Sequence, residues 1–125
     1  MLVSARIRAS LNQESAMSEQ QEEARLMIEL TRWGTDMGLE EALAALFTPS
    51  NETKSGDDGD PNVRKVLWFF EFVGALVKRD AISLDFVRDV WWIDGMWPLV
   101  KDHVLQAREG SGEATLYEHF EAMVG

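Results

Sequence analysis

The sequence contains no cysteine, and this absence excludes several kinds of chemistry at once. Disulfide bonds, thiolate nucleophiles, iron–sulfur clusters and cysteine-ligated zinc all need a thiol. Basic residues are also few, with 12 Lys and Arg against 22 Asp and Glu and a formal net charge of −10. Because nucleic-acid binding needs Lys and Arg to neutralise phosphates, we expect no nucleic-acid partner.

Long hydrophobic runs are missing as well. A membrane-spanning helix needs about 18 or more apolar residues in succession, whereas the most apolar stretch, residues 66–77, is shorter and is interrupted by Glu71. We therefore expect a soluble protein with no membrane contact. Since a chain without cysteine is compatible with a reducing compartment, we predict a cytoplasmic location.

No motif of a catalytic, nucleotide or metal site is present. The sequence has no nucleophile elbow, no phosphate-binding loop and no dinucleotide fingerprint. His103 and His119 are the only histidines, and neither belongs to a pair with helix-bundle metal spacing. The acidic loop at residues 48–60 lacks the terminal glutamate of an EF-hand in the registers that start at Asn51 and Asp58. We predict no metal and no cofactor, and we favour a protein that is not an enzyme.

The length of 125 residues fits one domain with its own hydrophobic core, and we expect residues 18–125 to form it. Residues 48–60 are rich in Gly, Ser, Asp and Asn and have no hydrophobic periodicity, which predicts a mobile acidic loop within that domain. Residues 1–17 are expected to be an N-terminal arm that is short and amphipathic, or disordered, or not translated. The simplest of these accounts begins the protein at Met17.

Hydrophobic periodicity predicts an all-α fold, a compact bundle of about six helices, and no segment shows the alternation of a strand. The first helix is expected over residues 19–33, with Gly34 as its end. A short second helix should end at Phe47. Asp60 and Pro61 supply an N-cap and a first-turn proline for the third helix.

The third helix, residues 61–79, is apolar on most of its surface and is therefore the predicted centre of the bundle. We expect neighbouring helices to cover it on most sides. Only a narrow polar strip is left for water, and Glu71 is the one acid in it. We predict that Glu71 lies in this strip near Arg64 and Lys78, and the alternative is a buried carboxylate that acts as a base.

The remaining helices are predicted from their caps. Ser83 is expected to cap the fourth helix. The Asp-Gly pair before Pro98 predicts a break there, so that a new helix follows and stops at Gly110. Thr115 with Glu118 forms a capping box that opens the last helix.

Two adjacent tryptophans lie in the segment that follows Ser83. Trp91 is at the edge of the apolar face, whereas Trp92 points to the polar side, where Arg88 is placed to stack on its ring. Burying a Trp is worth about 4–6 kcal/mol, from about 150–250 Å² of surface. We therefore expect Trp92 to be covered, either from within the chain, which we favour, or by a partner. Because Trp and Arg are typical of interaction hot spots, Trp91, Trp92 and Arg88 are the candidate interaction surface.

The central segment also carries a family resemblance. Its pattern is Asn62-Val-Arg64-Lys-Val-Leu67-Trp-Phe-Phe70-Glu71, then Leu76-Val-Lys78, Ile82, Val87 and Trp91, and finally Trp97-Pro98. This pattern resembles the bacterial domain of unknown function 4760 family over residues 62–108. The family has no assigned activity, so the resemblance implies a helical fold and marks three polar positions, Asn62, Arg64 and Glu71.

Two functions are therefore expected. The first is a protein-interaction module, self-association included, that uses the region of Trp91 and Trp92. The second is a small-ligand-binding protein or an enzyme that uses Glu71 in an aromatic-lined pocket with Trp68 and Trp97. The sequence identifies neither the partner nor the ligand.

Overall fold

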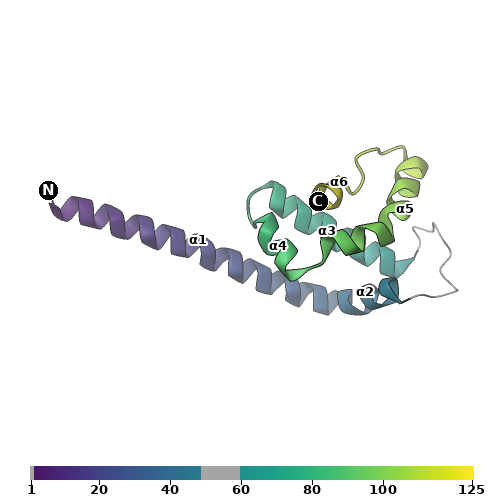
Figure 1. Cartoon of the computed structure of the whole chain (residues 1–125), viewed down its shortest axis with the longest axis horizontal. Helices are drawn as coiled ribbons and strands as arrows, with labels where there is room; N and C mark the ends of the chain where they lie inside the picture. Colours follow the sequence, from purple (N-terminus) through teal and green to yellow (C-terminus); the bar gives the residue numbers. More distant parts are fainter. Residues whose placement is uncertain (1, 49–59) are drawn as a thin grey trace. The chain divides into compact units, whose positions relative to one another are not determined.

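The computed structural model describes residues 2–48 and 60–125, with side chains described from residue 19 onwards. These residues form six α-helices and no strand, which confirms the all-α prediction (Figure 1). The helices are α1 (Leu2–Met37), α2 (Leu39–Phe47), α3 (Pro61–Lys78), α4 (Leu84–Val90), α5 (Ile93–Ser111) and α6 (Glu118–Ala122). The predicted acidic loop falls largely on residues 49–59, which lie outside the described residues. No described helix is both long enough and apolar enough to span a membrane.

The chain divides into two compact units, residues 1–32 and residues 33–125, and α1 passes from the first into the second. The second unit contains the other five helices and is described by itself from here on. Because α1 is one continuous helix, the expected start at Glu19 and the expected end at Gly34 are both wrong.

Gly34 is a packing residue and not a helix end. A Cβ added there would lie 3.1 Å from Leu39 Cδ2 and 3.4 Å from Phe69 Cε2, so the glycine lets α2 and α3 approach closely. The helix ends instead at Met37, before Gly38, whose φ of +83° is the left-handed conformation that glycine adopts readily.

The central helix α3 begins as its capping residues predict. The Asp60 side chain accepts a hydrogen bond from the Asn62 N–H at 2.9 Å, and Pro61 occupies the first turn. α2 and α6 pack extensively on α3, and α5 also contacts it. The enclosure is less complete than expected, because Trp68 is 68% exposed and Phe72 is 50% exposed.

Aromatic rings join α3 to its neighbours. Trp91 meets Phe69 and Phe70 edge to face, at centroid distances of 5.5 and 5.4 Å. The ring centroid of Phe120 in α6 lies 5.4 Å from that of Phe70 and 5.3 Å from that of Trp97 in α5. These contacts join α3, α5 and α6 in one aromatic core. Each such pair contributes about 0.5–1.5 kcal/mol beyond the effect of the area that it buries.

The start of α4 agrees with the prediction, and the start of α5 does not. Ser83 caps α4 as expected, since its Oγ accepts a hydrogen bond from the Phe86 N–H at 3.2 Å. The chain then breaks at Trp91 and Trp92, and α5 continues through Pro98, so the expected break at Pro98 is wrong. Pro98 is the sixth residue of α5, so this helix continues without the N–H that would bond to the Asp94 carbonyl.

Candidate functional site

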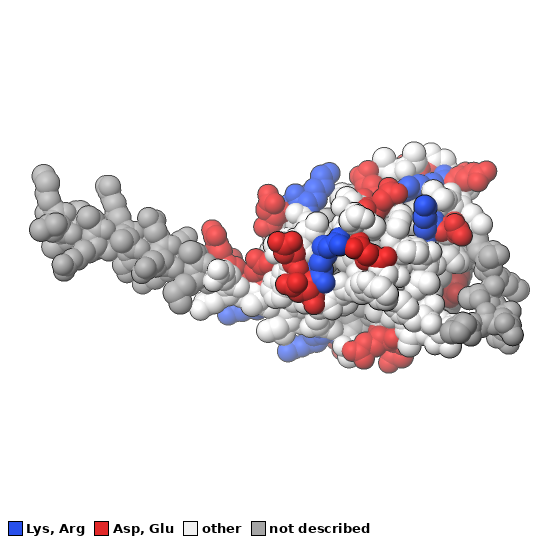
Figure 2. Space-filling model, viewed as in Figure 1, with Lys and Arg blue, Asp and Glu red and all other residues white. Residues whose placement is uncertain are grey.

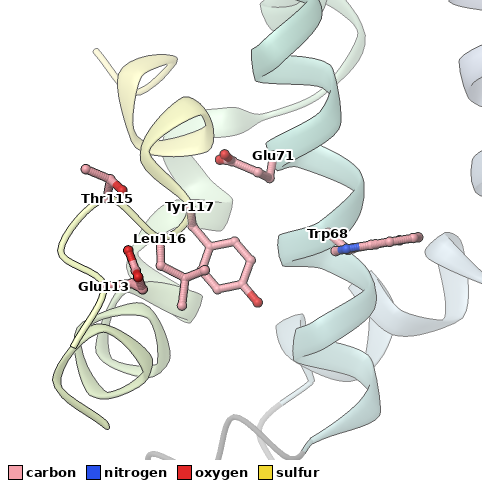
Figure 3. Close-up of a pocket in the computed structure, with 6 residues that line it drawn as sticks. All are labelled: Trp68, Glu71, Glu113, Thr115, Leu116 and Tyr117. Carbon is pink, nitrogen blue, oxygen red and sulfur yellow. The ribbon is translucent and has the colours of Figure 1, made fainter. Parts of the chain in front are cut away.

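Glu71 extends from α3 toward the segment that leads into α6 (Figure 3). Its Oε1 accepts hydrogen bonds from the backbone N–H groups of His119 at 2.8 Å and Phe120 at 2.9 Å. Its Oε2 lies 2.6 Å from Nδ1 of the His119 ring. The two side chains are 25% and 24% exposed, so the pair is half-buried. Arg64 and Lys78, the partners expected for Glu71, are not the groups that hold it.

The reason for this arrangement is the start of α6. The first N–H groups of a helix have no partner within the helix, and a carboxylate is favourable at that end. The residue at the N-cap position, Tyr117, has a φ of 62° and makes no capping bond with its side chain. The predicted capping box of Thr115 and Glu118 is therefore wrong, and a glutamate from another helix caps α6 in its place.

Gly74 lies on the same side of α3, about one turn after Glu71. A Cβ added at Gly74 would lie 2.6 Å from the carbonyl carbon of His119, which is backbone and has little freedom to move. Only glycine lets α6 come this close. Gly74 sets the approach of α6 to α3, and Glu71 fixes its position.

An open cleft of about 440 Å³ lies beside Glu71. It lies between α3 and the segment that joins α5 to α6, and it is lined by Trp68, Glu71, Glu113, Thr115, Leu116 and Tyr117. Figure 3 shows the Tyr117 ring extending toward α3, while the Trp68 ring points away from Leu116 and Tyr117. The expected lining residue Trp97 is instead buried in the core against Phe120.

The structure does not gather the three polar positions that the family resemblance marks. The backbone N–H of Asn62 donates to Asp60 at the start of α3. Arg64 is exposed and lies about 10 Å along the helix from Glu71, at about 1.5 Å per residue. Of the three, only Glu71 lines the cleft.

A second candidate site surrounds Trp92, the N-cap residue of α5. Trp92 is 70% exposed and stacks on Phe47 of α2, which is 46% exposed, with the ring centroids 6.2 Å apart and the ring planes 4° from parallel. A Cβ added at Gly95 would lie 2.5 Å from Trp92 Cε2, so the ring also rests on this glycine. The expected cover of Trp92 from within the chain is therefore only partial.

Arg88 and Trp91, the other residues of the expected surface, have different surroundings. Arg88 forms an ion pair with Asp94, and its Nη1 donates a hydrogen bond to the Met123 carbonyl at 3.0 Å. Arg88 therefore holds the segment that follows α6. The neighbour that stacks on Trp92 is Phe47 and not Arg88. The Gly125 N–H, and then Arg88, lower the pKa of Asp94 by hydrogen bonds to its carboxylate. Trp91 packs in the aromatic core.

Three residues of these sites have no sequence signal that marks them as site residues, namely His119, Tyr117 and Phe47. His119 meets Glu71 from 48 residues away, and neither residue lies in a motif that would link them. Tyr117 adopts a left-handed conformation that is uncommon outside glycine. The sequence predicts Phe47 only as the end of a helix, and no local signal indicates its pairing with Trp92.

On the face that Figure 2 shows, the charged side chains of the described residues form no basic patch. Figure 2 shows Asp and Glu interspersed with Lys and Arg over the face in view, and the acidic residues are the more frequent. Within the described ranges, no group of three or more His, Asp or Glu side chains is placed to hold a metal ion.

Comparison with known proteins identifies the family. The family model described as Domain of unknown function (DUF4760) matches residues 3–125, which is nearly the whole chain. The chain therefore belongs to this family, and the resemblance seen over residues 62–108 is confirmed. Searches among curated proteins and among solved structures found no significant match.

Proposed function

We propose that this member of the DUF4760 family is a protein-interaction module that binds a second copy of itself through its Phe47–Trp92 surface. This surface consists of the stacked rings of Phe47 and Trp92 together with Gly95. The observation that carries the proposal is the 70% exposure of Trp92, held against a second, partly exposed aromatic ring. Exposed aromatic residues in a preformed arrangement are typical of interaction hot spots.

The size of the exposed surface supports a weak to moderate dimer. At 70% and 46% exposure, the two rings leave roughly 170–290 Å² per copy in water, on a scale of about 150–250 Å² for each aromatic side chain. Burial at about 25 cal/mol/Å² yields about 4–7 kcal/mol per copy. Two copies together contribute about 8–14 kcal/mol, whereas association costs about 4–15 kcal/mol. Contacts of this size therefore support a dissociation constant in the micromolar to millimolar range.

A second copy is the partner that fits this surface best. In a two-fold dimer the same patch meets itself, and an uncharged aromatic patch is complementary to its own copy. The net charge of −10 comes from residues other than the two rings, which are uncharged. Repulsion between copies therefore acts mainly at the rim, where physiological salt screens charges beyond about 8 Å.

The test is sedimentation equilibrium of the full chain over a wide concentration range. Trp92→Ala and Phe47→Lys should each weaken self-association at least tenfold. Trp68→Ala is the matched control, because Trp68 is 68% exposed but lies outside the surface, and it should leave the dissociation constant unchanged. A wild-type chain that stays monomeric up to about 1 mM would refute the proposal, since that limit corresponds to only about 4 kcal/mol of binding free energy.

A second candidate function, ligand binding, is supported by the cleft beside Glu71. Its volume of about 440 Å³ falls within the range of about 300–1,000 Å³ that is typical of small-molecule sites. A catalytic role for Glu71 is less favoured, because its carboxylate already accepts two backbone hydrogen bonds and meets the His119 ring. Ligand binding predicts that small molecules shift the amide resonances of residues 113–117 in a saturable manner.

A further inference from the structure

We propose that the cleft beside Glu71 selects an organic cation of the alkylammonium class, the chemistry of a lysine side chain or a small biological amine. This inference rests on the second proposed function, that the cleft is a ligand site. It follows from three features of the lining: its negative charge, the ring of Tyr117 and the apolar side chain of Leu116.

The charge of the cleft favours a cation. Of the residues that the structure describes, two carboxylates, Glu71 and Glu113, line it, and no Lys, Arg or His does. An ionised carboxylate has about four lone-pair positions. The two backbone N–H groups occupy Oε1 of Glu71 and the ring of His119 meets Oε2, which leaves one acceptor position on Oε2 for a ligand. An anion would enter this cleft against two negative charges and would find no basic group within it.

The aromatic and apolar lining favours an organic cation over a bare metal ion. The Tyr117 ring extends from its own segment toward α3 (Figure 3), and a cation within about 6 Å of a ring centroid is attracted to the ring face. Leu116 offers an apolar contact for an alkyl chain. The described residues place no third carboxylate or histidine together with Glu71 and Glu113 to hold a metal ion.

The experiment compares three probes of similar size and different charge. The full chain, labelled with ¹⁵N, is titrated with n-butylammonium chloride, sodium butyrate and n-butanol at constant ionic strength. Only butylammonium should give saturable shifts at the amides of Leu116, Tyr117 and His119. Glu113→Gln should raise its dissociation constant about two- to fivefold, as expected for one exposed ion pair.

Glu109→Gln is the matched control, since Glu109 is an exposed α5 glutamate that does not line the cleft. It should leave the dissociation constant unchanged. Tyr117→Leu tests the ring separately and should weaken binding about two- to fivefold.

The outcomes separate this inference from the function on which it rests. If butanol binds at the same amides as tightly as butylammonium, the cleft is a ligand site but does not select cations, so this inference alone is wrong. If none of the three probes shifts these amides, both proposals are overturned. An effect of Glu109→Gln equal to that of Glu113→Gln would also overturn the inference, because the attraction would then come from the overall charge and not from the cleft.

Discussion

Replacing Glu71 with alanine removes the group that holds α6 on α3. The lost cap exposes two backbone N–H groups, which costs about 0.5–2 kcal/mol, and the lost contact with His119 costs about 1 kcal/mol or more. Because the Glu71 side chain is only 25% exposed, water replaces these bonds incompletely. We expect Glu71→Ala to lower the free energy of unfolding by about 2–4 kcal/mol, a large share of the roughly 5–15 kcal/mol typical of a domain.

Glu71→Gln distinguishes the contribution of the hydrogen bonds to stability from the contribution of the charge. The amide oxygen still accepts both backbone N–H groups, whereas the charge beside the helix start and the His119 ring is lost. We expect this variant to lose only about 1–2 kcal/mol, since hydrogen bonds to a charged acceptor are stronger than neutral ones by about that amount. Glu118→Gln is the control, because the Glu118 carboxylate lies 3.8 Å from Nε2 of the same ring and should contribute less than about 0.5 kcal/mol.

The measurement is urea unfolding followed by circular dichroism and tryptophan fluorescence, with the slope m compared between variants. Amide hydrogen exchange adds a local readout, and the N–H groups of His119 and Phe120 should lose protection first. The reasoning is refuted if Glu71→Ala unfolds at the wild-type midpoint, or if Glu71→Gln is as destabilising as Glu71→Ala.

Two further predictions concern the packing and the charge of the second unit. Gly74→Ala should destabilise the fold by about 3 kcal/mol or more, because the new Cβ meets the backbone of His119. Gly110→Ala places its Cβ where nothing lies within 4 Å. In the same unfolding assay, this variant should stabilise α5 by about 0.5–1 kcal/mol. The pKa of Asp94 is lowered from 3.8 in the folded chain by the Gly125 N–H and by Arg88. The ionised carboxylate of Asp94 therefore contributes its full stabilisation at pH values above 3.8. This contribution disappears as the pH falls through the lower pKa that Asp94 has in the folded chain. Asp94→Asn should unfold at lower urea than wild type near neutral pH, and the two midpoints should converge at strongly acid pH.

The parts of the fold that depend on neighbours in the sequence were predictable. Asp60 with Pro61, and Ser83, act within a few residues of their own position, so their roles follow from local capping rules. The apolar character of α3 likewise identified the centre of the bundle, because periodicity reports how much of a helix is buried.

The parts that depend on distant neighbours were not predictable. Gly34 and Gly74 lie where a side chain or the backbone of another helix comes close, and the sequence does not distinguish such a glycine from one that ends a helix. For this reason the prediction of a helix end at Gly34 is wrong.

The candidate site shows the same limit. Glu71 is conspicuous in the sequence as the only acid of an apolar helix, yet its partner His119 is 48 residues away and no local pattern links the two. Trp92 was likewise identified as a residue in need of cover, without any indication that Phe47 provides part of it.

The distant cap of α6 also determines when that helix can form. A helix of only five residues is not stable alone in water, where isolated helices shorter than about 12–15 residues are marginal. Because its cap comes from α3, α6 gains its hydrogen bonds only after the chain between them has closed, at an entropic cost that grows with the length of that loop. We therefore expect α6 to join late in folding, so that substitutions at Glu71 accelerate unfolding and leave the folding rate nearly unchanged.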